Sequence, residues 1–154
     1  MCLAPLATGN TKLKAAAPLR SKSELEVTAM GKDDRDILEI LGDELNFIEK
    51  GGYGRSVRTP RQPKSVFRDS LTCINYADPD HVRPCNECHL FDFVGPEHRH
   101  EEVPCHFIPL NETGETIEGL ELADNQAKLE RNVKDWLHTR IGEIEVERSK
   151  PAIV

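Results

Sequence analysis

Aromatic residues are scarce in this chain, which contains one Trp, two Tyr and five Phe. Charged residues, in contrast, make up 31% of the sequence. A hydrophobic core must therefore be built mainly from Leu, Ile and Val. At 154 residues the chain is long enough for one domain that buries a modest core of its own. A bound metal would add substantially to the stability of such a domain.

Long apolar runs are also missing. No window approaches the roughly 18 uninterrupted apolar residues that a membrane-spanning helix needs. The first seven residues are apolar, but no basic region precedes them and the polar run Thr8-Gly9-Asn10 follows, which is not the pattern of a secretory signal. We therefore expect a cytoplasmic protein, in which thiols stay reduced and clustered cysteines bind metal more often than they form disulfides.

The net charge of −7 argues against generic nucleic-acid binding, but one segment has the opposite sign. Positions 50–68 contain no acidic residue, and we call this segment the basic loop. It could lie against the acidic helices or against cysteine thiolates of the same chain, since four thiolates around one divalent ion leave a charge of about −2. Alternatively, it could contact a protein or nucleic acid, with Tyr53 and Phe67 available for stacking or burial. The basic residues are Lys50, Arg55, Arg58, Arg61, Lys64 and Arg68.

Two segments have the apolar periodicity of amphipathic helices. The first covers about 34–50 and ends at Gly51-Gly52, and the second covers about 124–145 with Asp124 as its predicted N-cap. Each helix needs a partner for its apolar face, so we expect the two to pack together. The apolar stripes are Ile37, Leu38, Leu41, Leu45 and Ile48 in the first helix, and Leu129, Val133, Trp136, Leu137, Ile141 and Ile144 in the second.

The other segments complete a predicted α+β fold. Residues 1–20 have no periodicity and are expected to form a disordered leader, followed by a single small metal-binding domain over 21–154. Ser21 and Glu24 have the spacing of a capping box. Prolines break the segment 71–109, which should form a knuckle of short strands and tight turns. Residues 106–110 and 115–120 flank a predicted turn at 111–114 and should form a small β-hairpin.

Four cysteines in this knuckle are the clearest chemical feature of the sequence. Cys85 and Cys88 form a Cys-x-x-Cys pair, and single cysteines precede and follow it at Cys73 and Cys105. A tetrahedral zinc ion needs four such ligands, and a Cys-x-x-Cys turn supplies two of them from one loop. The sequence therefore predicts a structural zinc site at these four residues, while Cys2 stands apart. His106 could replace Cys105, and His81 or His89 could replace Cys73.

The same cysteines could also hold a group other than structural zinc. An iron–sulfur cluster uses the same four thiolates. The segment from Cys85 to His89 also matches the attachment pattern of a c-type haem, although no methionine follows it to serve as the second axial ligand. The segment 84–88 matches half of the signature of zinc nucleobase deaminases, but the glutamate of the other half is missing near Cys73.

These observations favour a non-enzymatic role. No Ser/His/Asp set, carboxylate pair or reactive-cysteine pattern stands out, so no catalytic residue is predicted. A closed four-thiolate site has no open position for a substrate, and its natural use is to fix loops that contact a partner. We therefore predict a zinc-binding interaction module that contacts a protein or nucleic acid through the basic loop. The alternatives are a redox or electron-transfer protein with iron–sulfur or haem, and a metalloenzyme that uses His106 or His89.

Overall fold

The computed structural model describes residues 32–54, 57–58, 64–76, 80 and 82–151. They belong to one compact unit that spans residues 31–154. The predicted leader and capping box lie outside the described residues, as do Arg55, Arg61 and His81. No helix in the described part of the chain is long and apolar enough to cross a membrane.

The first predicted helix is present as α2, which spans Ile37–Glu49. Asp36 is its N-cap, and the Asp36 carboxylate accepts a hydrogen bond of 2.8 Å from the backbone N–H of Leu38. The helix ends where Gly51 adopts the left-handed conformation, with φ of 73°. Both ends therefore follow from local sequence.

The second predicted helix is longer than expected: α4 spans Gln126–Ser149. Its N-cap is Asn125, whose side chain accepts from the backbone N–H of Lys128, so the assignment of Asp124 as the cap is wrong. Asp124 instead has φ of 51° and separates α4 from the preceding helix. The helix continues through Gly142 to Ser149, and Pro151 then disfavours helical backbone at Lys150.

The predicted β-hairpin and the α+β class are wrong, because the described residues contain helices and turns but no strand. The turn at 111–114 does form, and the backbone N–H of Leu110 donates to the carbonyl of Glu115 across it. Beyond residues 108–110 on one side of this turn and 115–116 on the other, the chain forms short helices instead of strands. Thr116 caps the short helix α3 (Ile117–Leu122) by accepting from the backbone N–H of Gly119, and Pro104 begins a 3-10 helix on the other side.

The cysteine segment consists of 3-10 helices and turns instead of the predicted short strands. Its frequent prolines favour such short helices, because proline fits the first helical position but cannot donate to a sheet. The described residues of this segment contain four 3-10 helices: η1 (Cys85–Glu87), η2 (His89–Phe93), η3 (Pro96–His98) and η4 (Pro104–Phe107).

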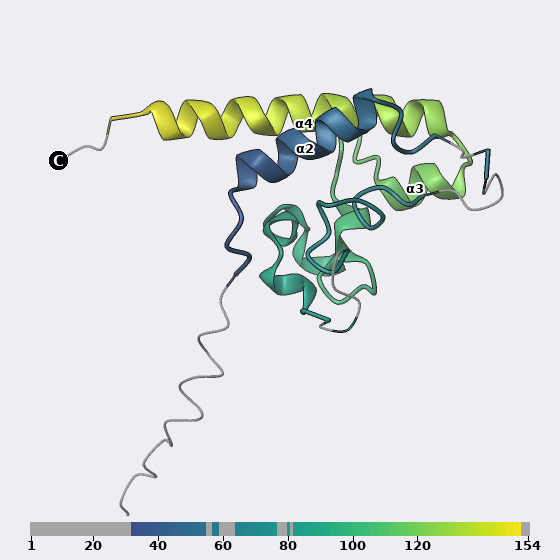
Figure 1. The fold of residues 1–154 in the computed structure, drawn as a ribbon, viewed down its shortest axis with the longest axis horizontal. Coiled ribbons are helices and arrows are strands. Elements are labelled where there is room, and N and C mark those ends of the chain that lie inside the picture. The colour runs from purple at the N-terminus through teal and green to yellow at the C-terminus, as the bar shows by residue number, and fades with distance from the viewer. Residues whose placement is uncertain (1–31, 55–56, 59–63, 77–79, 81, 152–154) are drawn as a thin grey trace, which may run out of the picture. The chain divides into compact units, whose positions relative to one another are not determined.

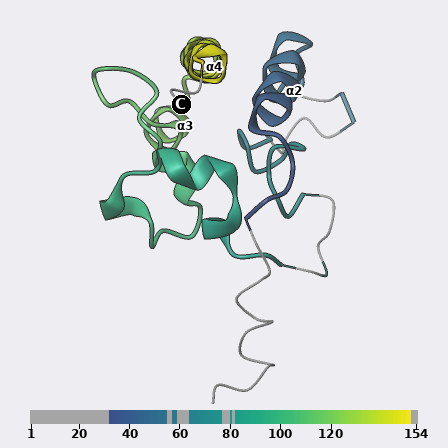
Figure 2. The same ribbon diagram turned by 90° about the vertical axis from the view of Figure 1, so that its left-hand side faces the viewer.

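Helices α2 and α4 pack against each other, as predicted (Figure 1). Figure 2 looks along α4 and shows α2 beside it, with the 3-10 helices of the cysteine segment below both. Trp136 of α4 lies at the centre of the core and makes an edge-to-face contact with Phe93, with ring centroids 5.2 Å apart. The cysteine segment thus rests on the core that the two helices provide. The buried core residues are Leu41, Ile48, Tyr53, Val66, Phe67, Leu90, Val94, Ile108, Leu110, Ile117, Leu120, Leu129, Val133, Trp136 and Leu137.

Candidate metal centre

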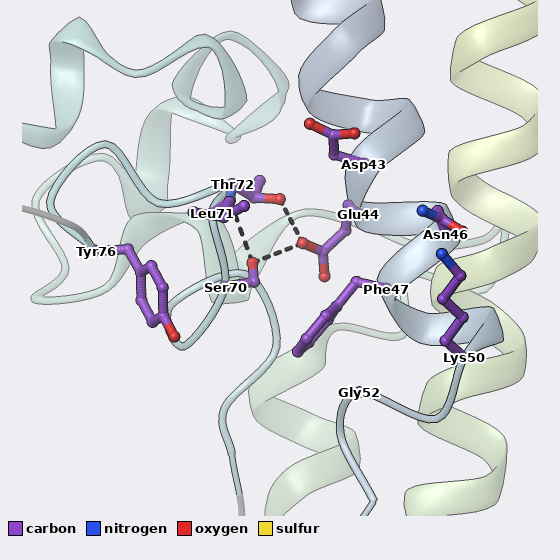
Figure 3. Close-up of a pocket in the computed structure, with 10 residues that line it drawn as sticks. All are labelled: Asp43, Glu44, Asn46, Phe47, Lys50, Gly52, Ser70, Leu71, Thr72 and Tyr76. Carbon is purple, nitrogen blue, oxygen red and sulfur yellow. Dashed lines mark hydrogen bonds between the residues drawn. The ribbon is translucent and has the colours of Figure 1, made fainter.

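A buried carboxylate on α2 anchors the residues that precede Cys73. Glu44 is only 1% exposed. One of its oxygens accepts from the Tyr53 hydroxyl at 2.5 Å, and the other accepts from the hydroxyls of Ser70, at 2.6 Å, and Thr72. Figure 3 shows Glu44 pointing from α2 toward Ser70 and Thr72. This network fixes the chain immediately before Cys73 against α2.

Phe67 extends the same network and has a strained backbone. Its φ of 63° is rare for a bulky residue, and its side chain is fully buried. The backbone N–H of Phe67 donates to the Tyr53 hydroxyl at 3.0 Å, and its ring centroid lies 6.0 Å from that of Trp136. The hydrogen bond and the burial of the ring offset the strain, which costs on the order of 1–3 kcal/mol.

Asn75 brings the segments of Cys73 and Cys85 together. Its side-chain amide donates to the carbonyl of Arg83 at 2.9 Å, and its side-chain oxygen accepts from the backbone N–H of Arg83 at 2.7 Å. Arg83 in turn pairs with Glu87, between Cys85 and Cys88, at 2.8 Å. The side chain of Asn75 therefore spans the two ends of the connection between the first and second cysteines.

The remaining cysteines lie in or beside short helices, with Cys88 between η1 and η2. Cys85 begins η1, and the backbone N–H of Cys88 donates to the Cys85 carbonyl at 3.0 Å, which gives the Cys-x-x-Cys pair a tight turn. Cys105 lies in η4 directly after Pro104, the first residue of that helix. Helices η2 and η4 contact each other, so Cys105 is brought close to the pair although it is distant in sequence.

All four cysteines line a single small cavity of about 40 Å³. None of the four forms a disulfide. In the described residues, no group of three or more Cys, His, Asp or Glu side chains is arranged to hold a metal ion. The four cysteines therefore line one cavity but are not arranged there as a metal coordination sphere. The other lining residues are Phe67, Ile74, Asn75, Leu90, Phe91 and Pro104.

Burial and proximity change the acidity of these thiols. Burial raises the pKa of Cys105 strongly, and the charges of Cys88, Cys73 and Cys85 raise it further. Burial also raises the pKa values of Cys85 and Cys88, with an added contribution from Cys73. Since the thiolate is the metal ligand, a cation that binds here must displace protons.

One side of the cysteine cluster is open. A second cavity, of about 350 Å³, is lined by Cys73, Cys85 and Cys105 together with polar residues of the surrounding loops. Cys85 is exposed, whereas Cys105 is partly covered and Cys88 packs against the core. The cluster is therefore reachable from outside through this cavity. The loop residues are Arg68, Asp69, Asn75, Tyr76, Glu102 and Val103.

This chain matches no known family. Comparisons with protein-family models, with curated proteins and with solved structures find no match.

The histidines suggested as substitute ligands have other partners. His106 is buried, and its Nε2 lies 3.0 Å from both the Ser65 hydroxyl and the carbonyl of Val66. His89 Nε2 lies 2.8 Å from the carbonyl of Arg35. Neither side chain lines the cavity of the four cysteines. The structure thus places the cysteines, and neither of these histidines, around the candidate site.

The structure divides the predicted basic loop into exposed cations and buried aromatics. Lys50, Arg58, Lys64 and Arg68 are exposed, and Lys64 donates to the carbonyl of Gly52 at 3.2 Å. Tyr53 and Phe67, in contrast, are buried in the core. Their rings are therefore engaged within the fold and are not presented for stacking on bases.

A separate cavity of about 590 Å³ lies between α2 and the loop around Cys73, from which residues 70–72 and Tyr76 line it (Figure 3). Leu71 and Tyr76 line it and are 62% and 50% exposed. Phe47 and Lys50 of α2 lie on the other side. This combination of an apolar cavity with exposed apolar side chains is typical of binding surfaces.

The arrangement of the cysteines leads to a prediction about their reactivity. In protein treated with a chelator, we expect iodoacetamide to modify Cys85 first and Cys105 last. Cys85 is exposed, whereas burial raises the pKa of Cys105 and reduces its thiolate fraction. Peptide mapping by mass spectrometry after short exposures measures the order. Equal rates at Cys85 and Cys105 would contradict the arrangement described above.

Proposed function

We propose that this protein is a zinc-binding interaction module in which Cys73, Cys85, Cys88 and Cys105 hold one structural zinc ion. The observation that supports this most strongly is the common cavity that the four thiols line. These cysteines come from three separate segments, so one ion bound to all of them would cross-link the loops. Such a cross-link stabilises loops that have little regular structure of their own.

The spacing of the cysteines favours zinc over the redox alternative. Iron–sulfur sites often use three closely spaced cysteines, whereas this chain has only the pair Cys85 and Cys88 with one single cysteine on each side. A c-type haem would place a porphyrin against Cys85 and Cys88, and the Cys88 side chain packs against the core instead. A four-thiolate zinc site also has no open coordination position, which favours a structural role over catalysis.

The surface next to the site supports a protein partner. The loop around Cys73, which the zinc ion would link to the other segments, carries Leu71 and Tyr76. Both side chains are exposed beside the 590 Å³ cavity. Nucleic-acid binding has less support, since Tyr53 and Phe67 are buried and the chain has a net charge of −7. The exposed cations of the basic loop, such as Arg68, would then lie at the edge of a protein interface. Because zinc requires reduced thiols, we place the protein in a reducing compartment such as the cytoplasm.

Metal analysis of the purified protein tests this proposal. After purification under reducing conditions, we expect elemental analysis to give about one zinc per chain. Replacement by cobalt should give sulfur-to-cobalt charge-transfer absorption and the intense visible bands of a tetrahedral site. Absence of bound metal would contradict the proposal, and so would iron with broad visible absorption. Cobalt bands of an octahedral, oxygen-rich site would exclude the four-thiolate set.

A further inference from the structure

We infer that Arg35 is the positioning residue of the metal centre: it ties the segment of Cys73 to the Cys85–Cys88 turn and so keeps these two ligand-bearing segments together. This inference rests on the proposed function, since it assigns a role at the same four cysteines. Arg35 is not itself a ligand. It precedes α2 and acts through hydrogen bonds to both ligand-bearing segments.

One end of the link is the chain just before Cys73. The Arg35 guanidinium donates from Nη1 to the carbonyl of Leu71 at 2.5 Å and from Nη2 to the carbonyl of Thr72 at 3.3 Å. Two donors of one rigid, planar group therefore hold two consecutive peptide units. Because the next residue is Cys73, this contact determines where the first sulfur lies.

The other end of the link is the Cys-x-x-Cys turn. The carbonyl of Arg35 lies 2.8 Å from Nε2 of His89, the residue directly after Cys88. The backbone N–H of Asp33 donates to the carbonyl of Glu87 at 2.8 Å, between the two cysteines of the pair. The stretch 33–35 therefore contacts the pair on both sides of Cys88.

Asp33 orients the Arg35 side chain between these two ends. The Asp33 carboxylate, in a residue only 5% exposed, accepts from Arg35 Nε at 2.9 Å and from Nη2 at 2.6 Å. Burial acts to raise the pKa of Asp33, but the hydrogen bonds from Arg35 outweigh it, and the pKa lies below its usual value. The pKa of Arg35 is raised, chiefly by its hydrogen bond to Asp33 and in smaller part by the charges of Cys88 and Cys73. A bidentate pair of this kind fixes the guanidinium plane.

Replacement of Arg35 should therefore weaken metal binding more than it perturbs the fold. Outer-shell partners of metal ligands typically contribute about 10- to 100-fold in affinity, and we expect a loss in this range for Arg35→Gln. Arg35→Lys keeps the charge but has a single terminal nitrogen that cannot reach Leu71, Thr72 and Asp33 together, so we expect it to lie between wild type and Arg35→Gln. Zinc affinity is measured by competition with a chromophoric chelator, and the cobalt spectrum reports the geometry of the bound ion.

A second arginine in the same unit provides a matched control. Arg148 also pairs with an aspartate, with Nη2 2.9 Å from Asp36 Oδ2, but it contacts neither cysteine segment through this pair. We expect Arg148→Gln to bind zinc as wild type does. Arg35→Gln leaves the Asp33 carboxylate without its guanidinium partner, and the double variant Asp33→Asn/Arg35→Gln removes this carboxylate as well. If its affinity stays low, the loss comes from the missing link and not from the unpaired negative charge of Asp33.

The outcomes separate the two proposals. If wild type binds no zinc, the proposed function fails. If wild type binds zinc through four thiolates and Arg35→Gln binds it equally well, the positioning role of Arg35 fails and the proposed function stands. An unchanged affinity in Arg35→Lys together with recovery of affinity in the double variant would show that charge alone matters and would also overturn the positioning role. Should Arg35→Gln not fold, the Arg35→Lys affinity and cobalt spectrum decide the question.

Discussion

Cys105→Ser is expected to abolish tight zinc binding and to destabilise the protein severely. Structural zinc contributes about 10–16 kcal/mol of apparent binding free energy in small peptides, whereas a whole domain is typically stable by only about 5–15 kcal/mol. In the proposed site, Cys105 would join η4 to the Cys-x-x-Cys pair, which lies far from it in sequence. Without it the ion keeps at most three sulfurs, and a serine hydroxyl is a poor zinc ligand. Zinc content and the midpoint of thermal unfolding measure both effects.

The control for this variant is the fifth cysteine, because Cys2→Ser makes the same chemical change outside the cluster. We expect Cys2→Ser to keep full zinc content and the wild-type unfolding midpoint. Removal of zinc from wild type by a chelator should lower the midpoint, and the same treatment should have little further effect on Cys105→Ser. If Cys105→Ser retains one tightly bound zinc per chain, or if the chelator destabilises it as much as wild type, Cys105 is not a ligand.

The two long helices were predictable from the sequence because their signals are local. The apolar residues of α2 and α4 repeat at helical spacing, and Gly51 marks the end of α2. The short helix α3 was not predicted, because its six residues contain too few apolar positions to show a period. Its N-cap, Thr116, follows a turn that also suits a hairpin, and the packing of Ile117 and Leu120 into the core decides in favour of the helix.

The candidate site was predictable only in part, for a similar reason. Sequence spacing selects Cys73, Cys85, Cys88 and Cys105 because cysteine is rare and a Cys-x-x-Cys pair is a recognisable unit. The residues that place these cysteines have no such signature. Glu44, in the middle of α2, and Arg35, just before it, look like ordinary charged residues, and their contacts with residues 70–72 depend on the tertiary fold. The bound metal itself remains a prediction.

Glu44→Ala is expected to be the most destabilising single substitution outside the cysteines among those proposed here. The Glu44 carboxylate accepts hydrogen bonds from the hydroxyls of Tyr53, Ser70 and Thr72, all of which are buried. Alanine would leave the hydroxyls of Tyr53 and Thr72 without this acceptor, whereas Ser70 keeps the carbonyl of Phe67 at 3.1 Å. Each unsatisfied buried group costs about 1–3 kcal/mol. We therefore expect a loss of about 3–5 kcal/mol, similar to the breaking of other buried polar networks. Urea denaturation of the zinc-saturated protein measures this free energy of unfolding.

Two further variants make this expectation specific to the network. Glu39→Ala removes the same type of side chain from the exposed face of α2, and we expect it to change stability by no more than about 0.5 kcal/mol. Glu44→Gln retains one carbonyl oxygen but turns an amide donor toward a hydroxyl that needs an acceptor, so its loss should be intermediate. Because the network holds residues 70–72, destabilisation by Glu44→Ala should also loosen the segment of Cys73 and speed the release of zinc to a chelator. If Glu44→Ala is no more destabilising than Glu39→Ala, the buried carboxylate does not anchor this segment, and the position of Cys73 must depend on Arg35 and Asn75 alone.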